Sequence, residues 1–172
     1  MAVSRTLIRA IGLQGFSPEV CMEKSNDLLC GESVDQMFVT VFYAIYNINT
    51  GQLEYCNGGH NSPYIMRANG SVEALPTSTN CLVGVIEGCT YKKEFAQLGA
   101  GDTLLMYTDG VNEAFNTDFQ EYGEARMEKK LGELNGSTCR KGIDGLLDDV
   151  KHFATGAEQS DDITIMALKR KA

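Results

Sequence analysis

The sequence lacks any apolar run approaching the roughly 18 residues that a membrane-spanning helix needs, so no transmembrane helix is expected. Basic residues are scarce, since 15 Lys and Arg stand against 23 Asp and Glu and give a formal net charge of −8. A nucleic-acid surface needs concentrated positive charge, which excludes nucleic acid as the main partner. Internal repeats and low-complexity segments are also missing. With 43% apolar and 22% charged residues, the composition is that of a folded globular chain.

The six cysteines include no C-x-x-C pair, so neither a zinc site nor a thioredoxin-like redox pair is indicated. We interpret them as reduced thiols of a cytoplasmic protein, mostly buried as small hydrophobic side chains. An acidic chain of this kind is better matched to metal cations or to basic protein patches.

Residues 1–18 contain Arg5 and Arg9 and no acid, a pattern that transit peptides and short amphipathic helices share. A secretory signal is disfavoured because the two arginines interrupt any apolar core. The helix is favoured because four apolar residues recur at helical spacing. These residues are Val3, Leu7, Ile8 and Ile11.

The pattern along the chain predicts helices, then antiparallel strands, then helices, then a last strand. Four helices are expected, over residues 2–13, from Ser17 and Pro18 onward, and over 122–134 and 138–153. Seven strands are expected, over residues 37–46, 53–57, 63–67, 71–75, 91–98, 103–107 and 163–168. The first strand is dense in aromatic and β-branched residues and is expected to be largely buried. Residues 31–36 are expected to form a polar linker. At about 150 residues per domain, this order predicts one α+β domain over residues 1–172, with helices packed on an antiparallel sheet.

Aspartates stand at the ends of two predicted strands. Asp109 follows strand 103–107 and precedes Gly110, and the pair Asp161 and Asp162 precedes the last strand. If the two strands are neighbours, the carboxylates of Asp109 and Asp161 meet at one rim and repel each other unless a cation or proton lies between them. An all-oxygen site suits Mg²⁺ or Mn²⁺. Aspartate at a strand end also serves as a turn or cap residue, and spacing alone leaves that alternative open.

Three segments together resemble a known family: MFVTVFYAIYNINTGQLEYCNGGHNSPYIMRANG, AGDTLLMYTDGVNEAFN and SDDITIMALK. Over nearly its whole length the chain resembles the metal-dependent protein serine/threonine phosphatases (PPM family), in their bacterial SpoIIE-type branch. The resemblance implies an antiparallel β-sandwich flanked by helices, with a two-metal site at one end. It implies that Asp109 and Asp161 are catalytic metal ligands and that Asp162 supports them. Gly110 would belong to the same metal site, where it lets the chain turn tightly.

The implied activity is Mn²⁺- or Mg²⁺-dependent dephosphorylation of phosphoserine or phosphothreonine in a protein. Metal-activated water would attack the phosphoryl group directly, without a phospho-enzyme. By analogy with the family, the substrate would be an anti-anti-sigma protein of the STAS type. An upstream sensor or receiver domain would act on the first two helices.

One family motif is missing. The Gly-Asp turn followed by a Gly-Lys-Gly or Gly-His-Gly loop, which supplies the aspartate that bridges both metals, does not occur in this chain. The chain therefore resembles a domain truncated before its first metal motif, without its N-terminal strands, and we expect it to be weakly active or inactive. The alternative is a non-catalytic regulatory or dimerisation module of the same fold, since unpaired sheet edges favour a homodimer.

Some residues and motifs keep two interpretations. His60, in the NGGH segment, could approach a phosphate or could organise the turn between two hairpins. Glu113 could contact metal-bound water or be solvated. Residues 108–111 superficially resemble the aspartyl nucleophile loop of haloacid-dehalogenase-type phosphatases. That class needs a second aspartate two residues after the first, and here Val111 stands at that position.

Overall fold

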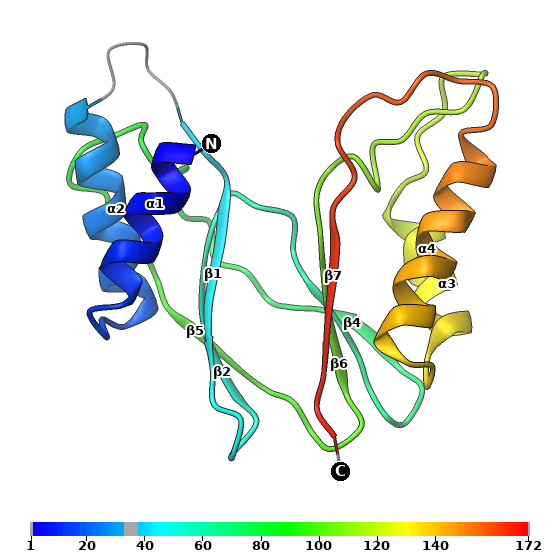
Figure 1. Ribbon diagram of the computed structural model, residues 1–172, viewed down its shortest axis with the longest axis horizontal. Coiled ribbons are helices and arrows are strands. Elements are labelled where there is room, and N and C mark those ends of the chain that lie inside the picture. Colours follow the sequence, from blue (N-terminus) through cyan, green and yellow to red (C-terminus); the bar gives the residue numbers. More distant parts are fainter. Residues whose placement is uncertain (1, 33–37, 172) are drawn as a thin grey trace. The chain divides into compact units, whose positions relative to one another are not determined.

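The computed structural model describes residues 2–32 and 38–171 and divides into two compact units, each with one antiparallel sheet and two helices (Figure 1). Unit 1 comprises Met1–His60 and Pro76–Gln97, and unit 2 comprises Asn61–Leu75 and Leu98–Ala172. The predicted α+β fold of helices and antiparallel strands is confirmed. Within the described part of the chain, every helix is too short or too polar to cross a membrane.

The sheet of unit 1 has the strand order β1-β2-β5, and both pairings are antiparallel. Its strands are β1 (Val41–Tyr46), β2 (Gln52–Gly58) and β5 (Glu94–Gln97), and its helices are α1 (Ala2–Gly12) and α2 (Pro18–Glu32). The hairpin between β1 and β2 turns where the sequence predicts it, because the side chain of Asn47 accepts hydrogen bonds from the amides of Asn49 and Thr50.

A buried amide ties α2 to the loop before β5. Asn26 is fully buried, its Oδ1 accepts from the amide of Gly84 at 2.9 Å, and its Nδ2 donates to the carbonyl of Ile86 at 2.8 Å. Nearby, Met22 of α2 packs in a cluster with Cys56, Val83 and Tyr91. The loop over residues 80–89 is therefore held in place by a polar side chain as well as by apolar packing.

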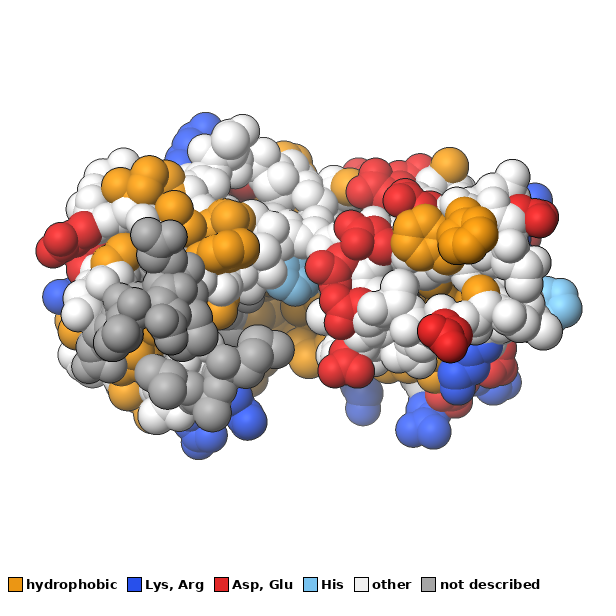
Figure 2. Space-filling model, turned by 90° about the horizontal axis from the view of Figure 1, so that it is seen from above, with side chains coloured by type: hydrophobic (Ala, Val, Ile, Leu, Met, Phe, Trp, Pro, Cys, Tyr) orange, Lys and Arg blue, Asp and Glu red, His pale blue; other side chains and the backbone are white. Residues whose placement is uncertain are grey.

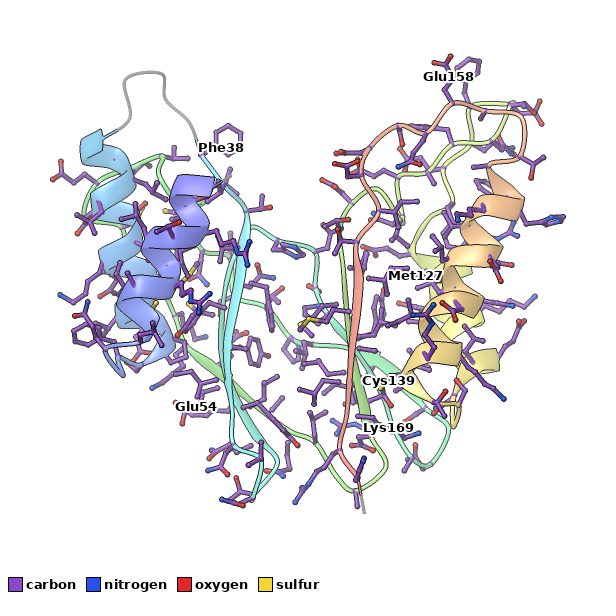
Figure 3. All side chains as sticks on the ribbon, in the orientation of Figure 1. Phe38, Glu54, Met127, Cys139, Glu158 and Lys169 are labelled. Carbon is purple, nitrogen blue, oxygen red and sulfur yellow. The ribbon has the colours of Figure 1, made fainter. Side chains whose placement is uncertain are left out.

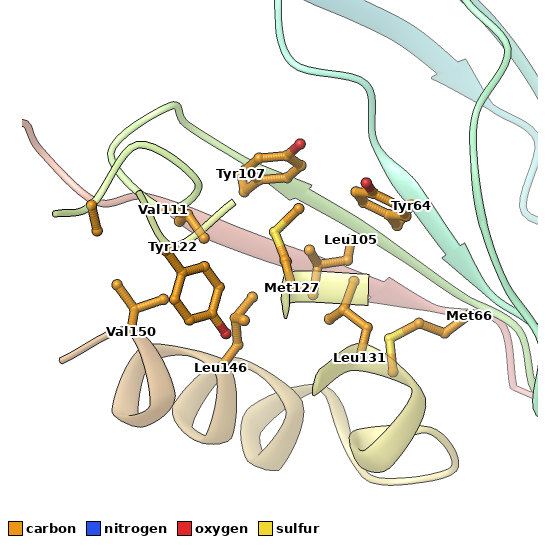
Figure 4. Close-up of a cluster of buried hydrophobic side chains, with 11 residues drawn as sticks. Tyr64, Met66, Leu105, Tyr107, Val111, Tyr122, Met127, Leu131, Leu146 and Val150 are labelled. Atoms are coloured by element: carbon orange, nitrogen blue, oxygen red, sulfur yellow. The ribbon is translucent and has the colours of Figure 1, made fainter. Parts of the chain in front are cut away.

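The sheet of unit 2 has the order β4-β3-β6-β7, again antiparallel throughout. Its strands are β3 (Tyr64–Met66), β4 (Val72–Ala74), β6 (Thr103–Tyr107) and β7 (Ile165–Lys169), and its helices are α3 (Glu124–Leu134) and α4 (Cys139–Phe153). Figure 4 shows the core between this sheet and its helices, where Leu105, Met127 and Leu146 meet with no exposed surface. Each such side chain stabilises the unit by about 1.5–3 kcal/mol relative to an exposed one.

Several expectations about unit 1 were wrong in detail. The segment expected as a largely buried strand over residues 37–46 forms β1 only from Val41, and its residues are at most half-buried, with Ile45 41% exposed. Phe38 is 57% exposed, and residue 37 lies outside the described residues. Strand propensity signals an extended backbone but not burial, and β1 is an edge strand of its sheet. The linker expected over residues 31–36 was wrong for its first two residues, because α2 continues to Glu32, and residues 33–36 lie outside the described residues.

The cysteines follow the sequence interpretation only in part. All six are free thiols. Only Cys21 and Cys56 are buried, and the other four are half-buried, so the expectation that most are buried was wrong.

Asp102 fixes the turn that leads into β6. Its carboxylate accepts hydrogen bonds from Nη1 of Arg67 at 2.8 Å and from the amides of Ala68 and Gly99 at 2.8 and 2.9 Å. Burial alone would raise the pKa of Asp102, but the Arg67 guanidinium and the two amides outweigh it and hold the pKa below its usual value.

Replacing Asp102 by Asn should lower the free energy of unfolding by about 2 kcal/mol at neutral pH, since hydrogen bonds to a charged group are lost. The folded-state pKa of Asp102 is lowered, so its contribution is complete above the unfolded-state pKa of about 3.9 and is lost as the pH falls through the lower folded value. Urea unfolding at pH 7 and near pH 3 should therefore show a smaller difference between wild type and Asp102→Asn in acid. A difference independent of pH would contradict this account, and Asp118→Asn, at an exposed aspartate, is the control.

Candidate functional site

The C-terminal end of β6 and the N-terminal end of β7 lie side by side at one end of the sheet of unit 2. This end, formed by residues 108–110 and 160–164, is called the edge below. The two strands pair antiparallel from Thr103 opposite Lys169 to Tyr107 opposite Ile165. The pairing continues beyond the strands, because the amide of Thr108 donates to the carbonyl of Thr164 at 3.0 Å. The prediction that Asp109 and Asp161 meet at one rim required the two strands to be neighbours. β6 and β7 are neighbours, so this condition is met.

Gly110 brings the two segments of this edge into contact. A Cβ atom on Gly110 would lie 2.7 Å from the carbonyl oxygen of Asp162 and 3.1 Å from that of Asp161, closer than packed atoms tolerate. The backbone of Gly110 does not have a positive φ. The expected tight turn is thus not what requires glycine here. The requirement is the close approach of another backbone segment.

The carboxylates at the edge make only local hydrogen bonds. Oδ1 of Asp109 accepts from the amide of Gly110 at 3.0 Å, and Oδ1 of Asp161 accepts from the amide of Asp162 at 2.6 Å. Asp109, Asp161 and Asp162 are all exposed. The other carboxylate oxygen of Asp109 and of Asp161 has no hydrogen-bond partner among the residues that the structure describes, so both are open to a cation.

The surroundings of this edge are acidic. Figure 2 looks onto the end of unit 2 where β6 ends and β7 begins, and it shows Asp and Glu side chains gathered there. Glu113 and Glu158 are exposed in the two adjoining loops. Figure 3 shows Glu158 at this end and Lys169 at the opposite end of β7. The resulting negative potential attracts cations and not free anions.

The donor chemistry of the edge fits a hard divalent cation, but the donor count is low. Asp109, Asp161 and Asp162 supply only oxygen atoms, which Mg²⁺ and Mn²⁺ prefer. Among residues 2–32 and 38–171, no group of three or more His, Cys, Asp and Glu side chains is arranged to hold a metal ion. The edge therefore offers part of a coordination sphere, and the ligand roles of Asp109, Gly110, Asp161 and Asp162 remain predictions.

Glu113 belongs to the site through its backbone. Its amide donates to the carbonyl of Asp109 at 2.8 Å, and its carbonyl accepts from Oγ of Ser160 at 3.3 Å. Its side chain is exposed. Glu113 therefore helps to join the two loops, whichever of its two predicted roles its carboxylate has.

His60 is held by a neighbouring side chain. Asn57 donates from Nδ2 to the carbonyl of His60 at 2.7 Å, and its Oδ1 accepts from the His60 amide at 2.8 Å. The turn after β2 is thus organised by Asn57 and the backbone of His60, with Gly59 at a φ of 80°, and both interpretations of the His60 side chain remain predictions. His60 belongs to unit 1, whereas the three aspartates belong to unit 2.

Sequence reasoning missed Thr108, whose hydroxyl crosses the edge. Its Oγ1 donates to the carbonyl of Asp162 at 2.9 Å and accepts from the amide of Thr164 at 2.9 Å. The only signal in the sequence is a hydroxyl residue directly before an aspartate at a strand end. That pattern does not reveal which distant backbone groups the hydroxyl contacts.

The chain is similar in sequence to known proteins over nearly its whole length. Residues 1–171 match the family model described as Stage II sporulation protein E (SpoIIE). The chain is 31% identical over 147 residues to Protein IcfG of Synechocystis, covering 85% of the chain and 23% of that protein. It is 24% identical over 158 residues to the phosphoserine phosphatase RsbU of Bacillus subtilis, covering 91% of the chain and 46% of that protein. The chain thus spans less than half of these two relatives.

Solved structures share the fold. A SpoIIE structure from Bacillus subtilis, containing its PP2C phosphatase domain and a fragment of its regulatory domain, superposes with a TM-score of 0.82 at 21% identity over 98% of this chain and 49% of that one. A manganese-presoaked structure of the same phosphatase domain gives a TM-score of 0.69 at 20% identity, over 98% of this chain and 73% of that one. At these identities the likeness shows the fold and leaves the roles of individual residues open.

Replacing Gly110 by Ala should cost about 1–3 kcal/mol of unfolding free energy, because the added methyl group collides with the carbonyl of Asp162. Amide chemical shifts of Asp161 and Asp162 should move with it. The matched control is Gly132→Ala in α3, where a Cβ meets nothing within 4 Å and the change should stabilise by about 0.5–1 kcal/mol. Equal stability of the two variants in urea unfolding would show that the close approach at Gly110 does not exist.

Proposed function

Since this chain belongs to the SpoIIE family, we propose that it is a protein phosphatase domain that removes phosphate from phosphoserine or phosphothreonine in a protein substrate. The observation that carries the proposal is the contact of Gly110 with the Asp162 carbonyl, because it brings Asp109 and Asp161 to one open edge. A relative that matches 91% of the chain, RsbU, is a phosphoserine phosphatase. The antiparallel sheets lend no support to the haloacid-dehalogenase-type alternative.

The proposed cofactor is Mn²⁺ or Mg²⁺, with Asp109 and Asp161 as ligands and Asp162 supporting them. The open carboxylate oxygens and the acidic surroundings favour a hard cation. Bound metal would supply the Lewis acid that activates water for attack on the phosphoryl group. The paired strands and the Gly110 contact hold the backbone segments that carry Asp109 and Asp161 against each other, so both residues could contribute to one site.

The proposed substrate is a phosphorylated anti-anti-sigma protein of the STAS type, in the cytoplasm. An upstream sensor or receiver domain is proposed to act on the domain, because the relatives are longer than this chain and a SpoIIE structure includes part of a regulatory domain. These assignments rest on the family and not on any contact within the two units.

A second candidate is a non-catalytic regulatory or homodimerising module of the same fold. The observation in its favour is the low donor count, since the described stretches contain no cluster of three metal-binding side chains. The sequence also has no Gly-Asp turn followed by a Gly-Lys-Gly or Gly-His-Gly loop. The 172-residue chain is therefore expected to turn over slowly, and a measurement must separate weak catalysis from none.

Mn²⁺ titrated into the ¹⁵N-labelled chain should first broaden the amide signals of residues 109–111 and 160–163, because the paramagnetic ion would lie between Asp109 and Asp161. Asp109→Asn and Asp161→Asn should each weaken this broadening at least about 10-fold. Asp148→Asn removes an exposed carboxylate on α4 and should change nothing. Broadening that begins at other acidic residues would contradict the proposed metal site.

Hydrolysis of a phosphoserine peptide in Mn²⁺ should be slow for the wild-type chain and lower by about 100-fold or more in Asp109→Asn and Asp161→Asn, equivalent to about 2.7 kcal/mol of transition-state stabilisation. Asp148→Asn should retain the wild-type rate. Turnover that survives both the Asp109→Asn and the Asp161→Asn substitutions would contradict the proposal that these aspartates are metal ligands. No wild-type turnover, together with intact Mn²⁺ binding, would favour the non-catalytic module.

A further inference from the structure

Thr108 makes three hydrogen bonds across the edge. Its amide donates to the carbonyl of Thr164 at 3.0 Å, while its hydroxyl donates to the carbonyl of Asp162 and accepts from the amide of Thr164, both at 2.9 Å. Thr108 is half-buried and directly precedes Asp109. One side chain thus joins the backbone beside Asp109 to the backbone on both sides of residue 163.

Two residues after β6, Thr108 and Gly110, contact the backbone carbonyl of Asp162. The Thr108 hydroxyl donates to this oxygen, and the bare backbone of Gly110 lies so close to it that a Cβ would come within 2.7 Å. Residues 154–164 contain no helix or strand, so the pairing of β6 with β7 does not itself fix their conformation. The Thr108 hydroxyl and the Gly110 contact, together with the hydrogen bond from Ser160 to Glu113, therefore help to fix residues 161 and 162 relative to Asp109.

A fixed arrangement matters because a cation that binds Asp109 and Asp161 together needs the two backbone segments that carry them in one place. Without the hydroxyl of Thr108, residues 159–164 would lose two hydrogen bonds that hold them beside Asp109 and could move away from it. The free energy of drawing them back would then be subtracted from the free energy of metal binding. With the hydroxyl in place, the two backbone segments already lie against each other before the ion arrives.

We propose that Thr108 is a positioning residue that fixes the backbone of residues 162–164 relative to Asp109 and thereby sets the affinity of the edge for a divalent cation. The inference rests on the proposed function, because it takes that edge to be the metal site. Thr108 does not touch the metal in this proposal. It acts through the backbone of Asp162 and Thr164.

Two substitutions separate the hydroxyl from the shape of the side chain. Thr108→Val keeps the branched shape and the backbone hydrogen bond to Thr164 but removes both bonds of the hydroxyl. Thr108→Ser keeps the hydroxyl and removes only a methyl group. Residues that orient metal ligands typically change metal affinity by 10- to 100-fold, so Thr108→Val should weaken Mn²⁺ binding by about that factor and Thr108→Ser should restore it to within a few-fold.

The first readout needs no metal. Hydrogen exchange of the Thr164 amide should accelerate in Thr108→Val, which has lost the acceptor of this N–H, and should stay near the wild-type rate in Thr108→Ser. The second readout is the midpoint of Mn²⁺-induced broadening at residues 109–111 in the whole chain, compared among the three proteins. If Thr108→Val does not fold, Thr108→Ala replaces it as the variant without the hydroxyl.

Faster exchange and a weakened Mn²⁺ midpoint in Thr108→Val, both rescued by Thr108→Ser, are the expected results. An unchanged midpoint in a folded Thr108→Val would overturn the inference, even if its stability in urea falls, because that pattern is a purely structural role. If the wild-type chain shows no broadening at the edge, the proposed metal site itself fails, and the role of Thr108 fails with it. The wild-type titration therefore distinguishes the two failures.

Discussion

The contact between Gly110 and the carbonyl oxygen of Asp162 is the constraint on which the rest of the site depends. A Cβ at position 110 would lie only 2.7 Å from the Asp162 carbonyl oxygen, so only glycine allows the loop after β6 to lie against the segment before β7. Asp109 directly precedes Gly110, and Asp161 directly precedes Asp162. The contact therefore brings these two aspartates to the same end of the sheet, which strand pairing alone does not ensure. The contact thus places the acidic residues after β6 beside those before β7.

The backbone contact at Gly110 depends on the order of the rest of unit 2. The core behind the sheet, in which Met127, Leu131 and Leu146 are fully buried, stabilises β6 and β7 in register. Hydrogen bonds across the edge then transfer that order to residues outside the strands. An ordered sheet therefore carries an exposed end, which is the arrangement that the proposed cation site requires.

Local patterns predicted much of this structure. The hairpin turns after β1 and β3 and the bounds of β6 follow from turn residues and alternation, and α4 begins within one residue of its expected start. The pairing of β6 with β7 could only be stated as a condition, because strand order depends on contacts far apart in the sequence. Thr108 and Asn26 were missed for the same reason, since their partners lie 54 or more residues away. The close approach that requires glycine at position 110 could not be predicted, because the neighbouring carbonyl of Asp162 lies far away in the sequence.

The central claim is that Asp109 and Asp161 form one cation site, and a double-mutant cycle on Mn²⁺ affinity tests it most directly. The affinity for Mn²⁺ would be measured for the wild-type chain, Asp109→Asn, Asp161→Asn and the double variant. The account predicts that the double variant binds little more weakly than either single variant, because each substitution alone disrupts the same site. Effects on binding free energy that simply add would mean that the two carboxylates act independently, and would contradict the account.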